Sequence, residues 1–104
     1  MYYEAIIQVR PESAAMGEAL MEEIKSYVRS RVGSQANATE GCFLSKEEEV
    51  HGGVDFYVSS NALARAIARE LAKKFGGTIG SSPRLHGMVR GKEVYRVTYI
   101  VRIP

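Results

Sequence analysis

The sequence predicts a single α+β domain of the ferredoxin-like class, a split βαβ sandwich with one added strand. Three observations predict it. The chain has 104 residues, which is the length of one domain. Apolar residues alternate with polar ones near both ends and in the middle of the chain, as in strands. Two segments between them have helical spacing. The resulting order, β-α-β-β-α-β-β, fits an antiparallel sheet with two helices on one face and the other face open.

The first strand and the first helix occupy the N-terminal third. Residues 2–10 are predicted to form a half-buried strand because four inward positions are apolar or aromatic: Tyr3, Ala5, Ile7 and Val9. Pro11-Glu12-Ser13 is a helix-start signal. The apolar stripe of that helix contains Met16, Leu20, Ile24, Tyr27 and Val28. Gly33 should end the helix, and residues 33–41 should form a loop.

A hairpin and a second helix follow. Residues 42–50 and 54–58 read as two strands joined by a turn at Gly52-Gly53. Ser59 or Ser60 can cap the next helix by accepting a bond from a free backbone N–H. Its apolar face contains Leu63, Ile67, Leu71 and Phe75. Gly76-Gly77 should supply the left-handed residue that ends it.

Two more strands complete the chain. Residues 78–89 form a weaker strand pattern, which we expect to be interrupted near Ser81-Ser82-Pro83 because proline lacks a backbone donor. A turn at residues 90–92 leads into the clearest strand in the sequence. Its inward positions are Tyr95, Val97, Tyr99, Val101 and Ile103.

The charges are divided unequally along the chain. Residues 1–55 carry ten acidic and five basic side chains, whereas residues 56–104 carry two acidic and nine basic ones. Such asymmetry favours a surface that faces a polyanion, although ordinary solvated faces would give the same counts. The nine bases could contact phosphates without base-specific geometry. These candidate polyanion-binding residues are Arg65, Arg69, Lys73, Lys74, Arg84, Arg90, Lys92, Arg96 and Arg102.

The open face of the sheet offers a second candidate surface. Successive side chains of a strand point to opposite faces, so Tyr57 points outward if Phe56 fills the core. Asp55 is expected on the open face near a base such as Arg96 or Arg102. Tyr57 could stack on a base, or the face could pack against another domain, because apolar side chains lie on it. The candidate residues are Tyr2, Ile6, Arg10, Tyr57 and Ile100.

Several classes of function are disfavoured. Cys42, His51 and His86 lack the spacing of zinc ligands, and the acidic run 47–49 reads as a solvated strand edge. The glycines at 76–80 follow a helix, whereas a phosphate loop precedes one. No apolar run approaches the roughly 20 residues that span a bilayer, and the single cysteine agrees with a reducing compartment. We therefore expect a cytoplasmic, non-enzymatic domain with no small-molecule substrate, no membrane contact and no cofactor of its own.

Three stretches carry a family resemblance: YYEAIIQVR, HGGVDFYVSSNALARAIAREL, and SSPRLHG followed by VYRVTYIVRIP. Together they resemble the middle region of the nonsense-mediated mRNA decay protein three family, in its archaeal form. In eukaryotes this family is the adaptor that takes the large ribosomal subunit out of the nucleus. The resemblance implies a non-enzymatic factor that binds the large subunit during assembly. Family members begin with zinc motifs absent here, so residues 1–104 are expected to be one domain excised from a longer protein.

Two functions remain open. In the first, the basic surface contacts rRNA or a ribosomal protein of the large subunit. In the second, the open sheet holds adjacent domains of the same full-length chain, without direct contact to RNA. Binding that weakens as salt rises separates the first from the second.

Overall fold

The computed structural model describes residues 2–38, 41–50 and 52–104. Its elements follow the predicted order. They are β1 (Ala5–Pro11), α1 (Glu18–Ala38), β2 (Leu44–Val50), β3 (Gly53–Val58), α2 (Asn61–Phe75), β4 (Thr78–Val89) and β5 (Lys92–Ile103). The α+β class and the split βαβ arrangement are confirmed.

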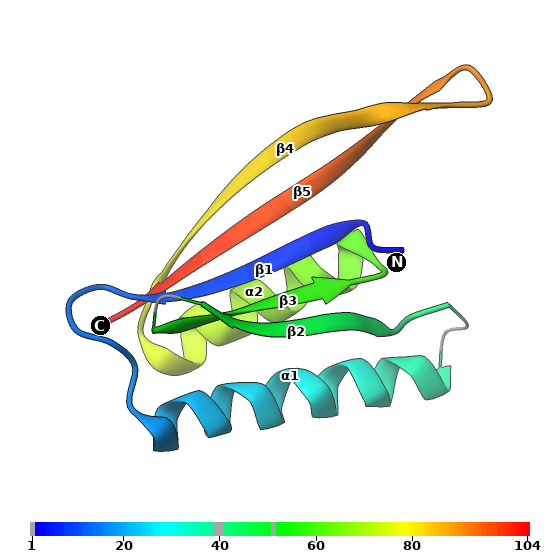
Figure 1. Cartoon of the computed structure of the whole chain (residues 1–104). Coiled ribbons are helices and arrows are strands. Elements are labelled where there is room, and N and C mark those ends of the chain that lie inside the picture. The colour runs from blue at the N-terminus through cyan, green and yellow to red at the C-terminus, as the bar shows by residue number, and fades with distance from the viewer. Residues whose placement is uncertain (1, 39–40, 51) are drawn as a thin grey trace.

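The sheet differs from the expected one in a single pairing. Its order is β2-β3-β1-β5-β4, and β5 lies parallel to β1, so the sheet is mixed rather than antiparallel throughout (Figure 1). The composition of the last two strands explains which one takes the inner position. β5 supplies the buried side chains Tyr99, Val101 and Ile103, whereas the middle of β4 is Gly80-Ser81-Ser82-Pro83 and stays exposed. Burial favours the apolar strand beside β1, and the hairpin then places β4 at the edge.

Both helices pack against one face of the sheet. The buried side chains of β1, β3 and β5 form one apolar cluster with those of the two helices. Phe56, Ile67 and Leu71 are completely buried within it. Ile24 of α1 belongs to the same cluster and Leu20 packs against it, as the helical spacing predicts. The face without helices carries the alternate side chains of the strands.

The bounds of α1 differ from the prediction at both ends. Pro11 still belongs to β1, opposite Ile103 of β5, and the helix begins only at Glu18. It also continues through Gly33 to Ala38. Val32 is buried in the core, and Arg31 pairs with Glu70 of α2, so contacts on both sides hold this part of the helix in place. Such contacts outweigh the low helix propensity of one glycine.

The ends of α2 agree with their signals. Ser60 is the cap, because its hydroxyl accepts a hydrogen bond from the Leu63 N–H at 3.2 Å. The Ser59 hydroxyl instead accepts from the Phe43 N–H and donates to the Gly41 carbonyl. Gly76 ends the helix at φ 69°, in the left-handed region where a side chain is strained.

β4 is one continuous strand, so the expected interruption near Pro83 is wrong. An edge strand has one unpaired side, and a proline is tolerated there. The irregularity lies instead between Leu85 and Gly87. The pairing of β1 with β5 starts at Val97. The hairpin therefore extends past the other strands as a two-stranded arm, residues 84–96, which Figure 1 shows projecting from the sheet.

Candidate functional site

The basic residues separate into a paired set and an unpaired set. All five bases of residues 1–55 form ion pairs. Arg10 pairs with Asp55, Lys25 with Glu49, Arg29 with Glu47, Arg31 with Glu70, and Lys46 with Glu48. None of the nine bases of residues 56–104 forms an ion pair with a carboxylate in the part of the chain that the structure describes. The excess positive charge of the second half is therefore not neutralised by the first.

The acidic run of β2 takes part in this pairing. Glu47 and Glu49 bind bases of α1, and Glu48 binds Lys46 on its own strand. As expected, the run lies on an edge strand and is partly exposed to solvent, and its ion pairs also connect α1 to the sheet. Glu70 of α2 joins the two helices instead. Hydrogen bonds from Arg31 of α1 hold the pKa of its carboxyl below the ordinary range.

The first group of unpaired bases is the α2 ridge, defined here as Arg65, Arg69 and Lys73. All three are exposed and recur every four residues on the helix face opposite the core. Arg65 and Arg69 also line a hollow of about 150 Å³ against Ile79, Gly80 and Ser81 of β4. The ridge thus borders the free edge of the sheet.

Lys74 lies apart from the ridge. Its ammonium group is 5.6 Å from the centre of the Tyr27 ring of α1 and 5.9 Å from that of Phe75. These distances are those of cation–π contacts. Lys74 therefore faces the junction of the two helices, and its charge is partly engaged by aromatic rings.

The second group lies on the arm. Arg84 stands opposite Arg96 where the arm leaves the sheet, Arg90 lies in the turn, and Lys92 follows it. Arg96 is anchored: its guanidinium carbon lies 3.9 Å from the centre of the Tyr3 ring, and its Nε donates to the Tyr3 carbonyl. The arm also exposes three large apolar or aromatic side chains, Leu85, Met88 and Tyr95.

Sequence reasoning missed the exposure of these three side chains. Alternation placed Tyr95 among the inward residues of the last strand, but inward positions are covered only where β1 and the helices lie alongside. The relevant signal is strand length. The last two strands have 12 residues each, whereas β1 has 7.

The open face holds the third part of the candidate surface. Ile6 is opposite Tyr57, Gln8 lies between Asp55 and Ile100, and Arg10 is opposite Arg102. Asp55 pairs with Arg10 at 2.7 Å, so the expected partners Arg96 and Arg102 are wrong. Among the described residues no donor is aligned with Asp55 Oδ1, which makes the contact an ion pair rather than a hydrogen bond.

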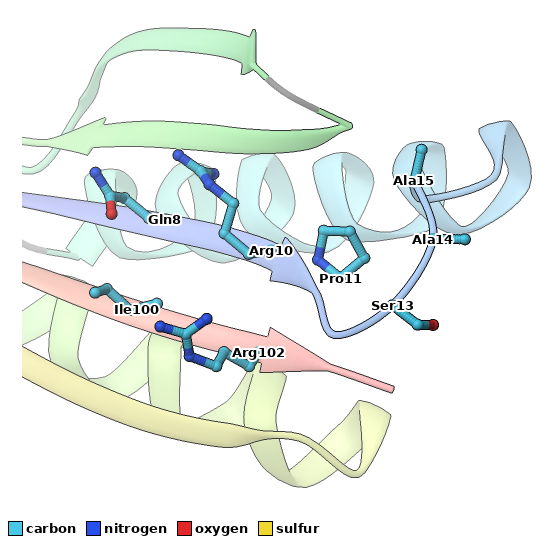
Figure 2. A pocket seen from close by; sticks show the side chains of 8 residues that line it. All are labelled: Gln8, Arg10, Pro11, Ser13, Ala14, Ala15, Ile100 and Arg102. Carbon is cyan, nitrogen blue, oxygen red and sulfur yellow. The ribbon is translucent and has the colours of Figure 1, made fainter.

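A shallow cavity of about 490 Å³ lies at the end of this face, beside the loop that follows β1. Figure 2 shows Arg10 and Arg102 on neighbouring strands at its border, with Ser13 and Ala15 on the loop. Arg10 is bound to Asp55, whereas Arg102 is exposed and has no carboxylate partner among the residues described. The cavity therefore has one free positive charge.

The aromatic companion of Tyr57 is Tyr3 rather than Tyr2. The two rings are 5.0 Å apart and meet edge to face. Regular alternation begins only at Ala5, because Glu4 turns toward α2 and accepts a hydrogen bond from the Asn61 N–H at 2.8 Å. Tyr3 consequently lies outside the core, contrary to its predicted inward position, and Tyr2 lies beside Phe43.

The chain matches the family model described as NMD3, second domain, over residues 2–103. The chain belongs to the NMD3 family. This confirms the family resemblance, and the family is known for ribosome-associated export adaptors. It is not a family of catalytic enzymes. No curated protein matches the chain.

Across residues 2–38, 41–50 and 52–104, no three His, Cys, Asp or Glu side chains gather as metal ligands would. His51, considered above as a ligand, lies outside these ranges. Neither helix has the apolar length that crossing a bilayer requires.

Proposed function

We propose that this NMD3 second domain is a non-enzymatic module that binds the large ribosomal subunit through phosphates of its rRNA. One observation carries the proposal. All five bases of residues 1–55 are ion-paired, whereas the nine bases of residues 56–104 have no described carboxylate partner. An unpaired base keeps its charge available for an external anion, and RNA is the anion that a ribosome-associated family meets.

Six of the nine bases form the core of the proposed surface. They are the α2 ridge and three residues of the arm, Arg84, Arg90 and Lys92, all exposed. Arg96 and Lys74 contact aromatic rings, and Arg102 borders the cavity of the open face. Contacts of exposed bases with phosphates position a protein on a nucleic acid without reading its sequence. Such contacts suit a large folded rRNA surface.

Co-sedimentation with purified large subunits tests the proposal. In the ridge variant, Arg65, Arg69 and Lys73 are all changed to Gln. Its matched control changes Ser26, Ser30 and Ser34 of α1 to Glu. The three serines are exposed and have the same four-residue spacing. Both variants change the net charge by the same amount, but only the first removes ridge charges.

The expected result is weaker binding of the ridge variant at every salt concentration, with the serine control close to the parent. Both variants should unfold at the parent temperature, since exposed substitutions usually change stability by within about 0.5 kcal/mol. Equal weakening of both variants would mean that net charge alone matters. Unchanged binding of the ridge variant would remove the ridge from the interface.

The open face supports a second function, contact with adjacent domains of the same full-length chain. Ile6, Tyr57 and Ile100 are only half-buried there, and a neighbouring domain could cover them. Changing Ile100 to Glu in the full-length protein tests this function. Easier proteolysis between the domains, with subunit binding retained, would support it. Loss of subunit binding by the isolated 104-residue chain would assign the face to the ribosome instead.

A further inference from the structure

The hollow beside the α2 ridge lies between that ridge and the free edge of the sheet. Its volume is about 150 Å³. The ridge bases Arg65 and Arg69 line one side of it, and Ile79, Gly80 and Ser81 of β4 line the other. We call this space the ridge hollow. A water molecule occupies about 30 Å³ of the liquid, so the hollow has room for roughly five, which is enough for a phosphate group.

The positive charge at the ridge hollow is not neutralised. Arg65 and Arg69 are both exposed, and neither has a carboxylate partner among the residues that the structure describes. The residues that line the hollow include no acidic side chain. Glu70 follows Arg69 in sequence, but it is bound on the other side of the helix by Tyr27 and Arg31 of α1. Two guanidinium groups are therefore free to meet an anion here.

The backbone of β4 adds an uncharged donor. The N–H of Val97 in β5 donates to the Glu4 carbonyl, on the side away from β4. Peptide groups alternate between the two sides of a strand, so that of Tyr99 also faces away from β4. Its opposite residue, Ser81, consequently directs its own N–H to the free edge. Pro83 agrees with this register, because it stands opposite Val97 and has no N–H to give.

The side chain of Ser81 lies on the same side of the sheet as α2. Directly opposite residues of two strands share a face, and the Tyr99 side chain is buried on the helix side, where its hydroxyl donates to Asn61. Ser81 is exposed, and its hydroxyl has no partner among the described residues. Ser81 thus brings two unused donors to a hollow that already has two arginines.

We propose that the ridge hollow holds one phosphate group, with Arg65 and Arg69 on one side and Ser81 on the other. The proposal rests on the proposed function for rRNA as the source of the phosphate. It replaces a general attraction of charges by a site with fixed donors. An arginine fork fits a phosphate through two hydrogen bonds, whereas a lysine acts only as a point charge. Lys73 belongs to the ridge but does not line the hollow.

Substitutions that keep the net charge distinguish a site from a charged face. Arg69→Lys removes an arginine fork, and Lys73→Arg is its control on the same ridge, outside the hollow. Ser81→Ala removes a hydroxyl donor. Its control is Ser82→Ala, because Ser82 is also exposed and points to the opposite face of the sheet. Binding is measured by co-sedimentation with purified large subunits, and folding is measured by thermal unfolding.

Arg69→Lys and Ser81→Ala should each bind large subunits roughly 10-fold more weakly than the parent, because each loses a hydrogen bond to a charged group. Both controls should bind as the parent does. All four variants should unfold near the parent temperature, because the substituted side chains are exposed. If Arg69→Lys and Ser81→Ala bind as the parent does while the ridge variant is weakened, the hollow takes no part in the rRNA contact and the proposed function stands on charge alone.

Inorganic phosphate tests the same site without RNA. In a nuclear magnetic resonance titration, the Ser81 amide signal of the parent should shift and saturate with phosphate, and it should shift far less in Arg69→Lys. An equal shift with chloride at the same ionic strength would overturn the phosphate site. If phosphate binds but the parent does not sediment with large subunits, the proposed function fails and the hollow belongs to a small phosphate compound.

Discussion

Ile67 lies fully buried on the inner side of α2, about half a helical turn from the exposed Arg65 and Arg69. Changing Ile67 to Ala should lower the free energy of unfolding by about 2–5 kcal/mol, because a closely packed site keeps most of the cavity. Urea unfolding followed by circular dichroism measures the change. Arg65→Ala on the same helix is the control and should stay within about 0.5 kcal/mol. A loss for Ile67→Ala no larger than for the control would contradict the observed burial.

Glu70 makes part of the stability depend on pH. Hydrogen bonds from Arg31 lower the pKa of its carboxyl below the ordinary 4.5, and the Tyr27 hydroxyl also donates to it. A depressed folded-state pKa gives stability that is complete above pH 4.5 and is lost as the pH falls through the folded value. Glu70→Gln should therefore be less stable than the parent at pH 7, and the difference should narrow below pH 4.5. Urea titrations across this pH range measure the difference in free energy of unfolding between the parent and Glu70→Gln. A difference that does not change with pH would show that the charge of Glu70 does not stabilise the fold.

At this scale the sequence predicted which way most side chains point but not their partners. Alternation correctly placed Phe56 in the core and Arg10 on the open face. The partner of Arg10 depends on the register between β1 and β3, which no local pattern reveals. From the sequence, Tyr2 was placed on the open face and Tyr3 in the core. This placement extended the alternation to residues before Ala5, where the strand has not yet begun.

Among the elements, α1 shows how a local signal can be overridden. A glycine lowers helix propensity by about 1 kcal/mol, and this alone suggested an end at Gly33. The burial of Val32 in the core and the ion pair of Arg31 with α2 depend on residues distant in sequence, so no local pattern reveals them. The α2 cap at Ser60 was predictable because its donor, the Leu63 N–H, lies three residues away.

Gly33 and Gly76 form a matched pair for substitution by alanine. A methyl group at either position would meet no atom within 4 Å, and the two differ in φ. Gly33→Ala should stabilise the protein by roughly 0.5–1 kcal/mol, because alanine restricts the unfolded chain and favours the helix. Gly76→Ala should destabilise it by about 1–2 kcal/mol, because φ is 69° there. Thermal melts of both variants measure these changes in stability. A Gly76→Ala variant more stable than the parent would contradict the left-handed end of α2.

The two halves of the chain carry net charges of opposite sign, and the salt dependence of binding should reflect this. Each phosphate contact releases counterions, so the logarithm of the binding constant falls linearly with the logarithm of the salt concentration. Removing three ridge contacts should reduce this slope by roughly 2 to 3. Co-sedimentation of the ridge variant and the serine control over several salt concentrations measures both slopes. Parallel lines for parent and ridge variant would show that the ridge meets no phosphate.

The overall architecture was predictable from the order of elements, but the mixed sheet was not. The prediction took the hairpin of β4 and β5 as a simple extension of an antiparallel sheet. The chain instead places the more apolar of these two strands inside, and β5 lies parallel to β1 as a result. The basic residues of the candidate surface could be predicted, because the count of charged residues shows that the second half of the chain is basic. A cavity where the arm leaves the sheet was not foreseeable, because Tyr2 and Tyr95, which both line it, lie far apart in the sequence.

The parallel pairing of β1 with β5 bears on how the protein is made. β1 is a central strand, yet the partner on one of its sides is the last strand of the domain to be synthesised. A nascent chain that has completed α2 can form β1, β2 and β3, but β1 then presents an unpaired edge. That edge stays open to other extended chains until β5 is free to dock. Stalling synthesis when α2 but not β5 has emerged from the ribosome should therefore increase aggregation of the nascent domain, whereas stalling after β5 has emerged should not.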